Sequence, residues 1–121
     1  MRLDFSNWTH RILSVEHLKL DIDNPRFSYF SNKKMNQTEI VKFLIERFEV
    51  YELAKNIATD GYLLNEVPIV FKDMDSYVVL EGNRRIAACK VLLNPYRYLS
   101  TQKAQNILKY NYSIDKLTCH I

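Results

Sequence analysis

Four consecutive residues, Gly82, Asn83, Arg84 and Arg85, have the chemistry of a phosphate-binding loop. They follow an apolar stretch typical of a strand and precede one typical of a helix, which places the arginines in a first helical turn. A helix N-terminus offers unsatisfied N–H groups and a partial positive charge, glycine lets the backbone approach a ligand, and arginine donates forked, charged hydrogen bonds. Since arginine opposes the helix dipole at this end, its presence favours an anion-binding role.

The two arginines are not expected to act alike. Neighbouring side chains on a helix project about 100° apart, so we expect one arginine to reach a ligand while the other holds the loop. A structural explanation stays open, in which the pair is solvated or forms ion pairs with Glu81 or Asp60.

Two carboxylates are candidates for catalysis beside this loop. Glu81 directly precedes Gly82, where it has the position to bind Mg²⁺ or to orient a water for attack on a phosphate. Glu66 comes five residues after Gly61, on a second loop. The alternatives are structural: Glu81 as a strand-end residue paired with an arginine, and Glu66 as an exposed loop acid.

The histidines and the aromatic clusters give weaker indications. The three histidines are far apart in the sequence, and each is expected at the surface or satisfied in the core rather than acting as a base: His10, His17 and His120. The segments 96–98 and 109–112 mix tyrosine with basic residues, as surfaces that stack on nucleic-acid bases do. A helix packing its aromatic residues on a sheet explains the same pattern, and we favour it.

Local signals predict the elements that position the loop. Asn36 with Glu39 fits a helix capping box, and Gly61 is expected to end a second helix as its left-handed C′ residue. Asn94-Pro95 ends the helix that follows Gly82. The expected strands are residues 14–21, 67–71, 76–80 and 116–121, and the expected helices begin near 36, 50, 83 and 100.

Length and composition limit the class of protein. The chain has 121 residues, 47% hydrophobic and 26% charged, which fits one globular domain and excludes disordered, collagen-like and coiled-coil proteins. Glycine occurs only twice, where average usage would give about eight. The net charge of +3 comes entirely from residues 94–121, which hold four basic residues and Asp115, and it is too small to indicate nucleic-acid binding by itself.

Other features concern the cellular setting. Cys89 and Cys119 lie thirty residues apart without a C-x-x-C pair, so we expect reduced thiols. No apolar run reaches the roughly 18–20 residues of a membrane span, and the first residues lack a signal-peptide pattern, so we expect a cytoplasmic protein without membrane contact. Because the sequence stops within an expected strand, we interpret the domain, 1–121, as the N-terminal part of a longer protein.

Three segments, taken in order, resemble a known family. They are Asp23-Asn24-Pro25-Arg26, then the E-L-A-x-x-I segment at 52–57 leading to Gly61 and Pro68, and then residues 81–88 with the G-N-R-R motif. This order is similar to the ParB N-terminal domain of the ParB/sulfiredoxin superfamily, and the resemblance covers residues 15–94. It implies a small α/β (α+β) fold with a mixed sheet and packed helices.

The resemblance also implies a ligand. In such domains two loops face each other around a nucleoside triphosphate, so residues 82–85 would hold the phosphates of CTP or ATP, and the segment from Gly61 to Pro68 would line the nucleotide. Asn83 stands where partition proteins have glutamate and where sulfiredoxins have the reactive cysteine, which excludes sulfiredoxin chemistry. Partition proteins normally have an E-N-x-x-R segment after the next strand, and this sequence has no match to it before Ile121.

Three hypotheses of function follow from the resemblance and the residues. In the first, which we favour, the domain binds a nucleoside triphosphate with Mg²⁺ at Glu81 and hydrolyses or transfers its phosphate. Its setting would be DNA transactions such as plasmid partition or mobile-element and phage-related processes, with a homodimer formed through parts beyond this chain. In the second hypothesis the same arginines bind DNA without a nucleotide, and in the third the site is a metal-dependent nuclease.

Overall fold

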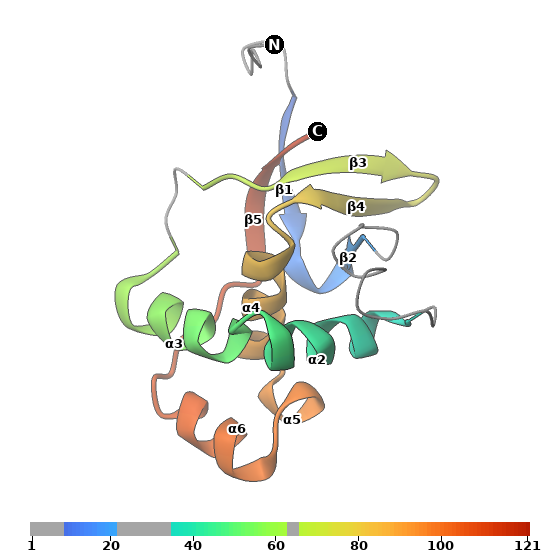
Figure 1. Cartoon of the computed structure of the whole chain (residues 1–121). Coiled ribbons are helices and arrows are strands. Elements are labelled where there is room, and N and C mark those ends of the chain that lie inside the picture. The colour runs from blue at the N-terminus through green and yellow to red at the C-terminus, as the bar shows by residue number, and fades with distance from the viewer. Residues whose placement is uncertain (1–8, 22–34, 63–65) are drawn as a thin grey trace.

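The computed structural model describes residues 9–21, 35–62 and 66–121. A five-stranded mixed sheet lies at one side of this part of the chain, and its strand order is β1-β5-β3-β4-β2. The helices gather on the other side (Figure 1). The expected α+β class with a small mixed sheet is therefore confirmed.

The sheet combines two antiparallel and two parallel pairs. β1 pairs with β5 and β3 with β4 in antiparallel register, whereas β2–β4 and β3–β5 are parallel. Parallel pairing needs a crossover, which includes α2 and α3 between β2 and β4, and α4, α5 and α6 between β3 and β5. The strands are β1 (His10–Ser14), β2 (Leu18–Leu20), β3 (Ile69–Asp73), β4 (Ser76–Glu81) and β5 (Lys116–His120).

Helix α4 is the centre of the core. Its side chains from Ile86 to Val91 are at most 8% exposed, and it contacts α3, η2 and β2. In Figure 1, α2 and α3 cross in front of it, and α5 and α6 lie below its C-terminal end. The helices are η2 (Val15–His17, a 3₁₀ turn), α2 (Gln37–Arg47), α3 (Val50–Asp60), α4 (Asn83–Leu93), α5 (Pro95–Tyr98) and α6 (Thr101–Leu108).

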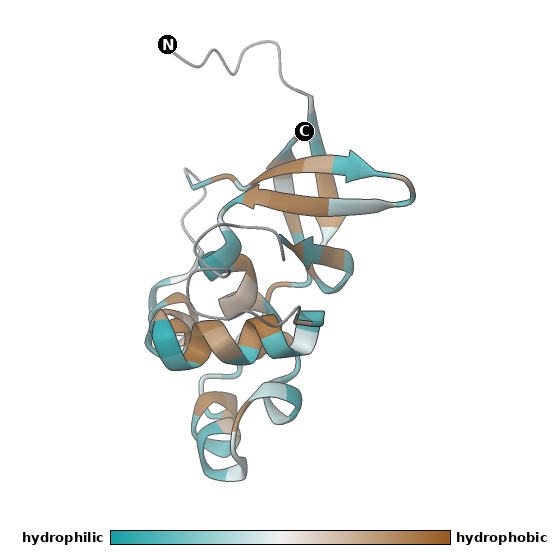
Figure 2. Cartoon of the chain, turned by 45° about the vertical axis from the view of Figure 1, so that its right-hand side comes forward, coloured by the Kyte–Doolittle hydropathy of each residue, from teal (hydrophilic) through white to brown (hydrophobic). Residues whose placement is uncertain are grey.

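Local sequence signals placed most element boundaries correctly. Asn36 and Glu39 form the expected capping box, and the Ser100 hydroxyl accepts a hydrogen bond from the Lys103 N–H. The hairpin is tighter than expected, because β3 and β4 are joined only by Met74 and Asp75, with Met74 at φ 57°. Figure 2 shows that apolar residues occupy much of this hairpin.

The N-terminal part differs from the expectation. A continuous strand over 14–21 is wrong for Val15–His17, which form a 3₁₀ turn between β1 and β2. The turn lets Val15 and Leu18, three residues apart, both enter the core. Strand β1 was not predicted, because three of its five residues are exposed and give no alternating pattern.

Two further expectations concern the whole chain. Both cysteines are free, as expected, and both are buried. Within the described ranges, no helix has the length and apolar character that crossing a bilayer requires.

Candidate functional site

The phosphate-binding loop predicted from the sequence forms a strand–glycine–helix turn. Gly82 follows β4 with φ 103° and ψ 18°, and its carbonyl accepts the first helical hydrogen bond from the Ile86 N–H at 2.9 Å. The first turn of α4 contains no acidic residue, and no described side chain caps it. Its leading N–H groups therefore keep their capacity to bind an anion.

Pro68 packs directly against this glycine. A Cβ atom built on Gly82 would lie 3.4 Å from the Pro68 Cβ, at van der Waals contact, so a substitution here would be strained by the φ of 103° more than by lack of space. Pro68 is fully buried, and its carbonyl accepts a hydrogen bond from the His120 N–H at 2.9 Å. The structure thus brings together Pro68 and Gly82, two residues that the sequence places at the site.

Arg85 forms an ion pair with Glu66, through Nε and Oε2. Both side chains are about one-third exposed, at 31% and 32%. Neither Glu81 nor Asp60, the partners considered in the structural alternative, takes this position, and Glu66 is not the exposed loop acid of its structural alternative. A second contact holds the backbone of Glu66, because the Tyr62 hydroxyl donates to the Glu66 carbonyl at 2.8 Å.

Arg84 points to a different part of the molecule. Its Nε donates to the carbonyl of Phe48 at 2.8 Å, at the C-terminal end of α2. The side chain is exposed. The expected divergence of the two arginines is therefore observed, with one at the α2–α3 junction and the other on Glu66.

Asn83 has a structural use for its side chain. It is 9% exposed, its Oδ1 accepts from the Asp21 N–H at 3.1 Å, and its Nδ2 donates to the Val79 carbonyl at 3.2 Å. These bonds join the end of β2 to β4 and to the start of α4. Asn83 can therefore serve a phosphate through its backbone N–H, whereas its amide is engaged by the fold.

Glu81 lies at the exposed end of β4 and forms no ion pair with any described residue. In the part of the chain that the structure describes, no group of three or more His, Cys, Asp or Glu side chains gathers. Magnesium commonly uses one or two carboxylates together with substrate phosphates and water, so Glu81 fits such a partial ligand set.

Gly61 ends α3 but in an unexpected conformation. Its φ of 82° and ψ of 163° lie in a region that is essentially restricted to glycine, rather than in the left-handed helical region. A Cβ atom there would meet only the Tyr112 hydroxyl, at 3.9 Å, and that hydroxyl accepts from the Tyr62 N–H. Gly61 therefore contacts the segment before β5, and not the Pro68–Gly82 pair.

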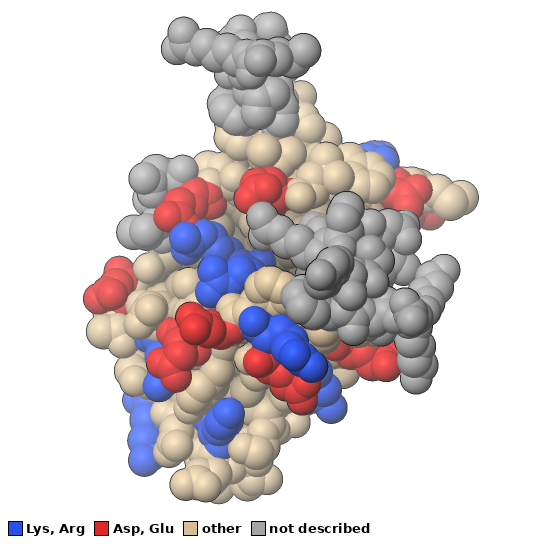
Figure 3. Space-filling view, in the orientation of Figure 1, with Lys and Arg blue, Asp and Glu red and all other residues tan. Residues whose placement is uncertain are grey.

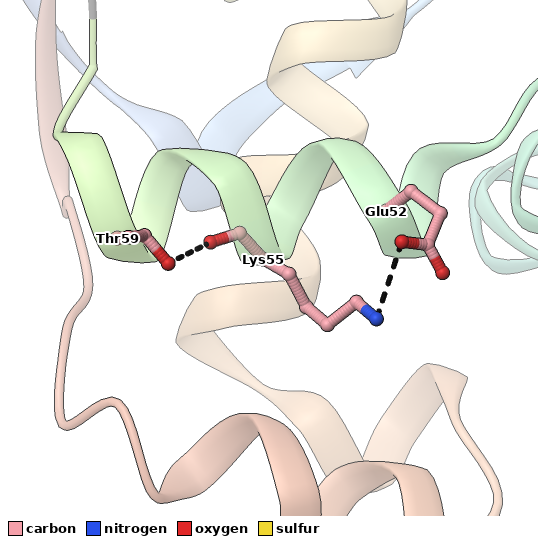
Figure 4. A network of polar contacts seen from close by, with 3 residues as sticks. All are labelled: Glu52, Lys55 and Thr59. Atoms are coloured by element: carbon pink, nitrogen blue, oxygen red, sulfur yellow. Dashed lines mark hydrogen bonds and ion pairs between the residues drawn. The ribbon is translucent and has the colours of Figure 1, made fainter.

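The E-L-A-x-x-I segment lies on α3, and its polar residues are used within the helix. Lys55 pairs with Glu52 at 3.2 Å, and the Thr59 hydroxyl donates to the Lys55 carbonyl at 2.9 Å. Figure 4 shows this row along the side of α3 that faces α6. The Asp23–Arg26 segment lies outside the described residues.

The surface around the loop has mixed charge. In Figure 3, basic side chains gather near the middle of the face, with acidic side chains above and below them. This pattern fits a small local anion site better than an extended basic surface.

Sequence reasoning missed two groupings that the fold creates. His10 and His120 are opposite each other on β1 and β5, with ring centroids 4.3 Å apart. Burial, and then the neighbouring His10, lowers the pKa of His120. The second grouping is the buried Lys90 of α4 with the backbone carbonyls that it contacts. The sequence did indicate a buried cation here, since Lys90 is the one charged residue between Ile86 and Leu93.

Comparison of the chain with family models, with curated proteins and with solved structures found no match. The resemblance to the ParB N-terminal domain therefore rests on the three sequence segments alone.

Proposed function

We propose that this chain is a ParB-like domain that binds a nucleoside triphosphate, CTP or ATP, with the phosphates at residues 82–85. One observation carries the proposal: α4 begins at a glycine with positive φ, and its first turn has two arginines and no acidic residue. Free N–H groups and the helix dipole act at the start of α4, and each guanidinium group can bind a phosphate there once it leaves its present partner, the Phe48 carbonyl for Arg84 and Glu66 for Arg85.

The contacts of the arginines support an exchange of partners. Arg85 binds the carboxylate of Glu66, and a phosphate oxygen can replace that carboxylate with the same hydrogen-bond geometry. Arg84 donates to a neutral carbonyl at the surface, a weaker bond that it can leave for a charged phosphate. In the proposed complex Glu81 binds Mg²⁺ together with phosphate oxygens, and Glu66 is the second candidate for catalysis.

The experiment is isothermal titration of the full chain with CTP, ATP and GTP, with and without Mg²⁺. Arg84→Ala is expected to abolish binding, and Arg47→Ala, which removes an exposed arginine at the end of α2, should have no effect. Circular dichroism checks that both variants fold. Unchanged affinity in Arg84→Ala would refute the proposal.

Hydrolysis and a DNA-related setting come from the resemblance, as part of the same proposal. Turnover is measured as phosphate release, which should disappear in Glu81→Gln while binding persists. If the arginines instead bind DNA without a nucleotide, fluorescence anisotropy should show affinity that falls steeply with salt, because each neutralised phosphate releases counterions. A nuclease would nick plasmid DNA, and Glu81→Gln would stop it.

A further inference from the structure

A pocket of about 600 Å³ lies at the opposite end of α4 from the arginine loop. Small-molecule sites commonly have volumes of about 300–1,000 Å³. None of the residues from Gly82 to Arg85 lines this pocket. Its wall combines apolar, aromatic and basic side chains, among them Leu18, Tyr77, Lys90, Leu93, Arg97 and Tyr98.

Lys90 supplies a buried cation to the wall. It is 8% exposed, and its Nζ donates to the carbonyls of Val15 at 3.1 Å and Glu16 at 3.2 Å. An ammonium group has three N–H donors, and these carbonyls use two of them. No described residue accepts from the third.

Arg97 places a second positive charge close to Lys90. Burial first, and then the charge of Arg97, lowers the pKa of Lys90 to about 8, and the opposing effect of Glu16 is smaller. The Arg97 guanidinium also lies over the Tyr98 ring, 5.7 Å from its centroid. The charge of Arg97 disfavours the charged form of Lys90, and an anionic ligand placed between the two groups would relieve this repulsion.

The charged groups of the wall lie at different depths. Glu16, Asp75, Asp115 and Arg97 are all exposed, so water screens their charges at the rim, whereas Lys90 is buried. The half-buried rings of Tyr77 and Tyr98 provide amphipathic walls.

We propose that this pocket binds a small organic anion, whose carboxylate or phosphate group lies between Lys90 and Arg97 and whose flat body packs against Tyr98 and Leu93. The site is separate from the nucleotide site and does not depend on it.

The test uses benzoate, its neutral analogue benzamide, and inorganic phosphate as probes of the ¹⁵N-labelled full chain. Benzoate should shift the amide signals of Leu18, Leu93 and Asn94 and leave those of Gly82 and Arg84 in place, and benzamide should bind much more weakly. Inorganic phosphate shows whether a phosphate group also occupies the anion position. We expect Arg97→Gln to weaken benzoate binding about tenfold, the usual effect of losing one charged hydrogen bond.

Controls keep the result decisive. Arg47→Gln, on another helix, should leave the affinity unchanged, and Lys90→Met should weaken binding at least as much as Arg97→Gln. If Lys90→Met does not fold, Arg97→Gln decides alone, because Arg97 is exposed. Equal binding of benzoate and benzamide, unchanged affinity in Arg97→Gln, or no shift with benzoate and phosphate up to about 10 mM would each overturn the proposal.

Discussion

At the N-terminal end of α4 the basic groups of Arg84 and Arg85 reach the surface, whereas at the C-terminal end the ammonium group of Lys90 is buried. The arginines bind one carbonyl and one carboxylate from neighbouring loops. Lys90 binds two carbonyls of the 3₁₀ turn η2 and thereby fixes this turn to the core helix.

This difference separates roles in binding from roles in stability. An exposed arginine with a replaceable partner can be removed at little cost to the stability of the fold. The need for arginine at such a position therefore comes from the ligand that it binds. A buried lysine is held by packing and by hydrogen bonds to two backbone carbonyls, so its removal lowers the stability of the fold directly. The two ends of one helix therefore allow a direct comparison of how much each basic residue contributes to the stability of the fold.

The largest expected effect is the loss of stability in Lys90→Ala. The change leaves a cavity in the core and removes the two hydrogen bonds that join α4 to the turn η2, which should lower the free energy of unfolding by about 2–4 kcal/mol. Arg84→Ala should lower it by less than about 1 kcal/mol. Urea denaturation of both variants and of the wild type measures this, and equal losses would remove the distinction between the two ends.

The second prediction concerns pH. Burial lowers the pKa of Lys90 from 10.5 to about 8 in the folded protein, so between these values the unfolded chain binds more protons than the folded one. The Lys90 contribution to stability therefore rises as pH increases through this window. Relative to Lys90→Met, the wild type should gain up to about 3 kcal/mol across it.

Other groups do not obscure this comparison. Burial raises the pKa of Cys89 to about 12 and also raises that of Tyr62, effects that lower stability at high pH in both proteins alike. Denaturation of wild type and Lys90→Met at several pH values isolates the lysine. A constant difference between them would show that Lys90 keeps its ordinary pKa.

Gly82 tests how the N-terminal end is built. Alanine would be strained at φ 103°, with its Cβ in contact with Pro68, which we expect to cost about 1–2 kcal/mol and to weaken nucleotide binding. Gly61→Ala is the matched control, since its φ of 82° is also unfavourable but its Cβ would contact only the Tyr112 hydroxyl, at 3.9 Å. It should lose similar stability and keep the affinity, measured by calorimetry. Equal loss of affinity in both variants would contradict the role assigned to Gly82.

The site was predictable from the sequence where local signals determine it. The turn at Gly82 follows from an apolar strand, a glycine and a helical pattern in direct succession, and the Asn36 cap follows from the spacing to Glu39. The Arg85–Glu66 and Pro68–Gly82 contacts join residues 14 to 19 positions apart across loops, and no local pattern encodes which acid meets which arginine. Lys90 is intermediate, because a single charge within an apolar helix indicates a buried cation but not its partners.

The smallest expected effect is a gain of affinity in Glu66→Gln. Removing the carboxylate frees Arg85 from its partner while glutamine keeps the size of the side chain, so the phosphates no longer compete with an anion. A partly exposed ion pair is worth about 0.2–1 kcal/mol, which corresponds to roughly a 1.4- to 5-fold tighter nucleotide complex without Mg²⁺. Glu46→Gln, at an exposed position of α2, is the control. If the nucleotide affinity of Glu66→Gln instead falls only when Mg²⁺ is present, Glu66 is a metal ligand in the complex. If the affinity falls both with and without Mg²⁺, Glu66 positions Arg85 rather than competing with the phosphates.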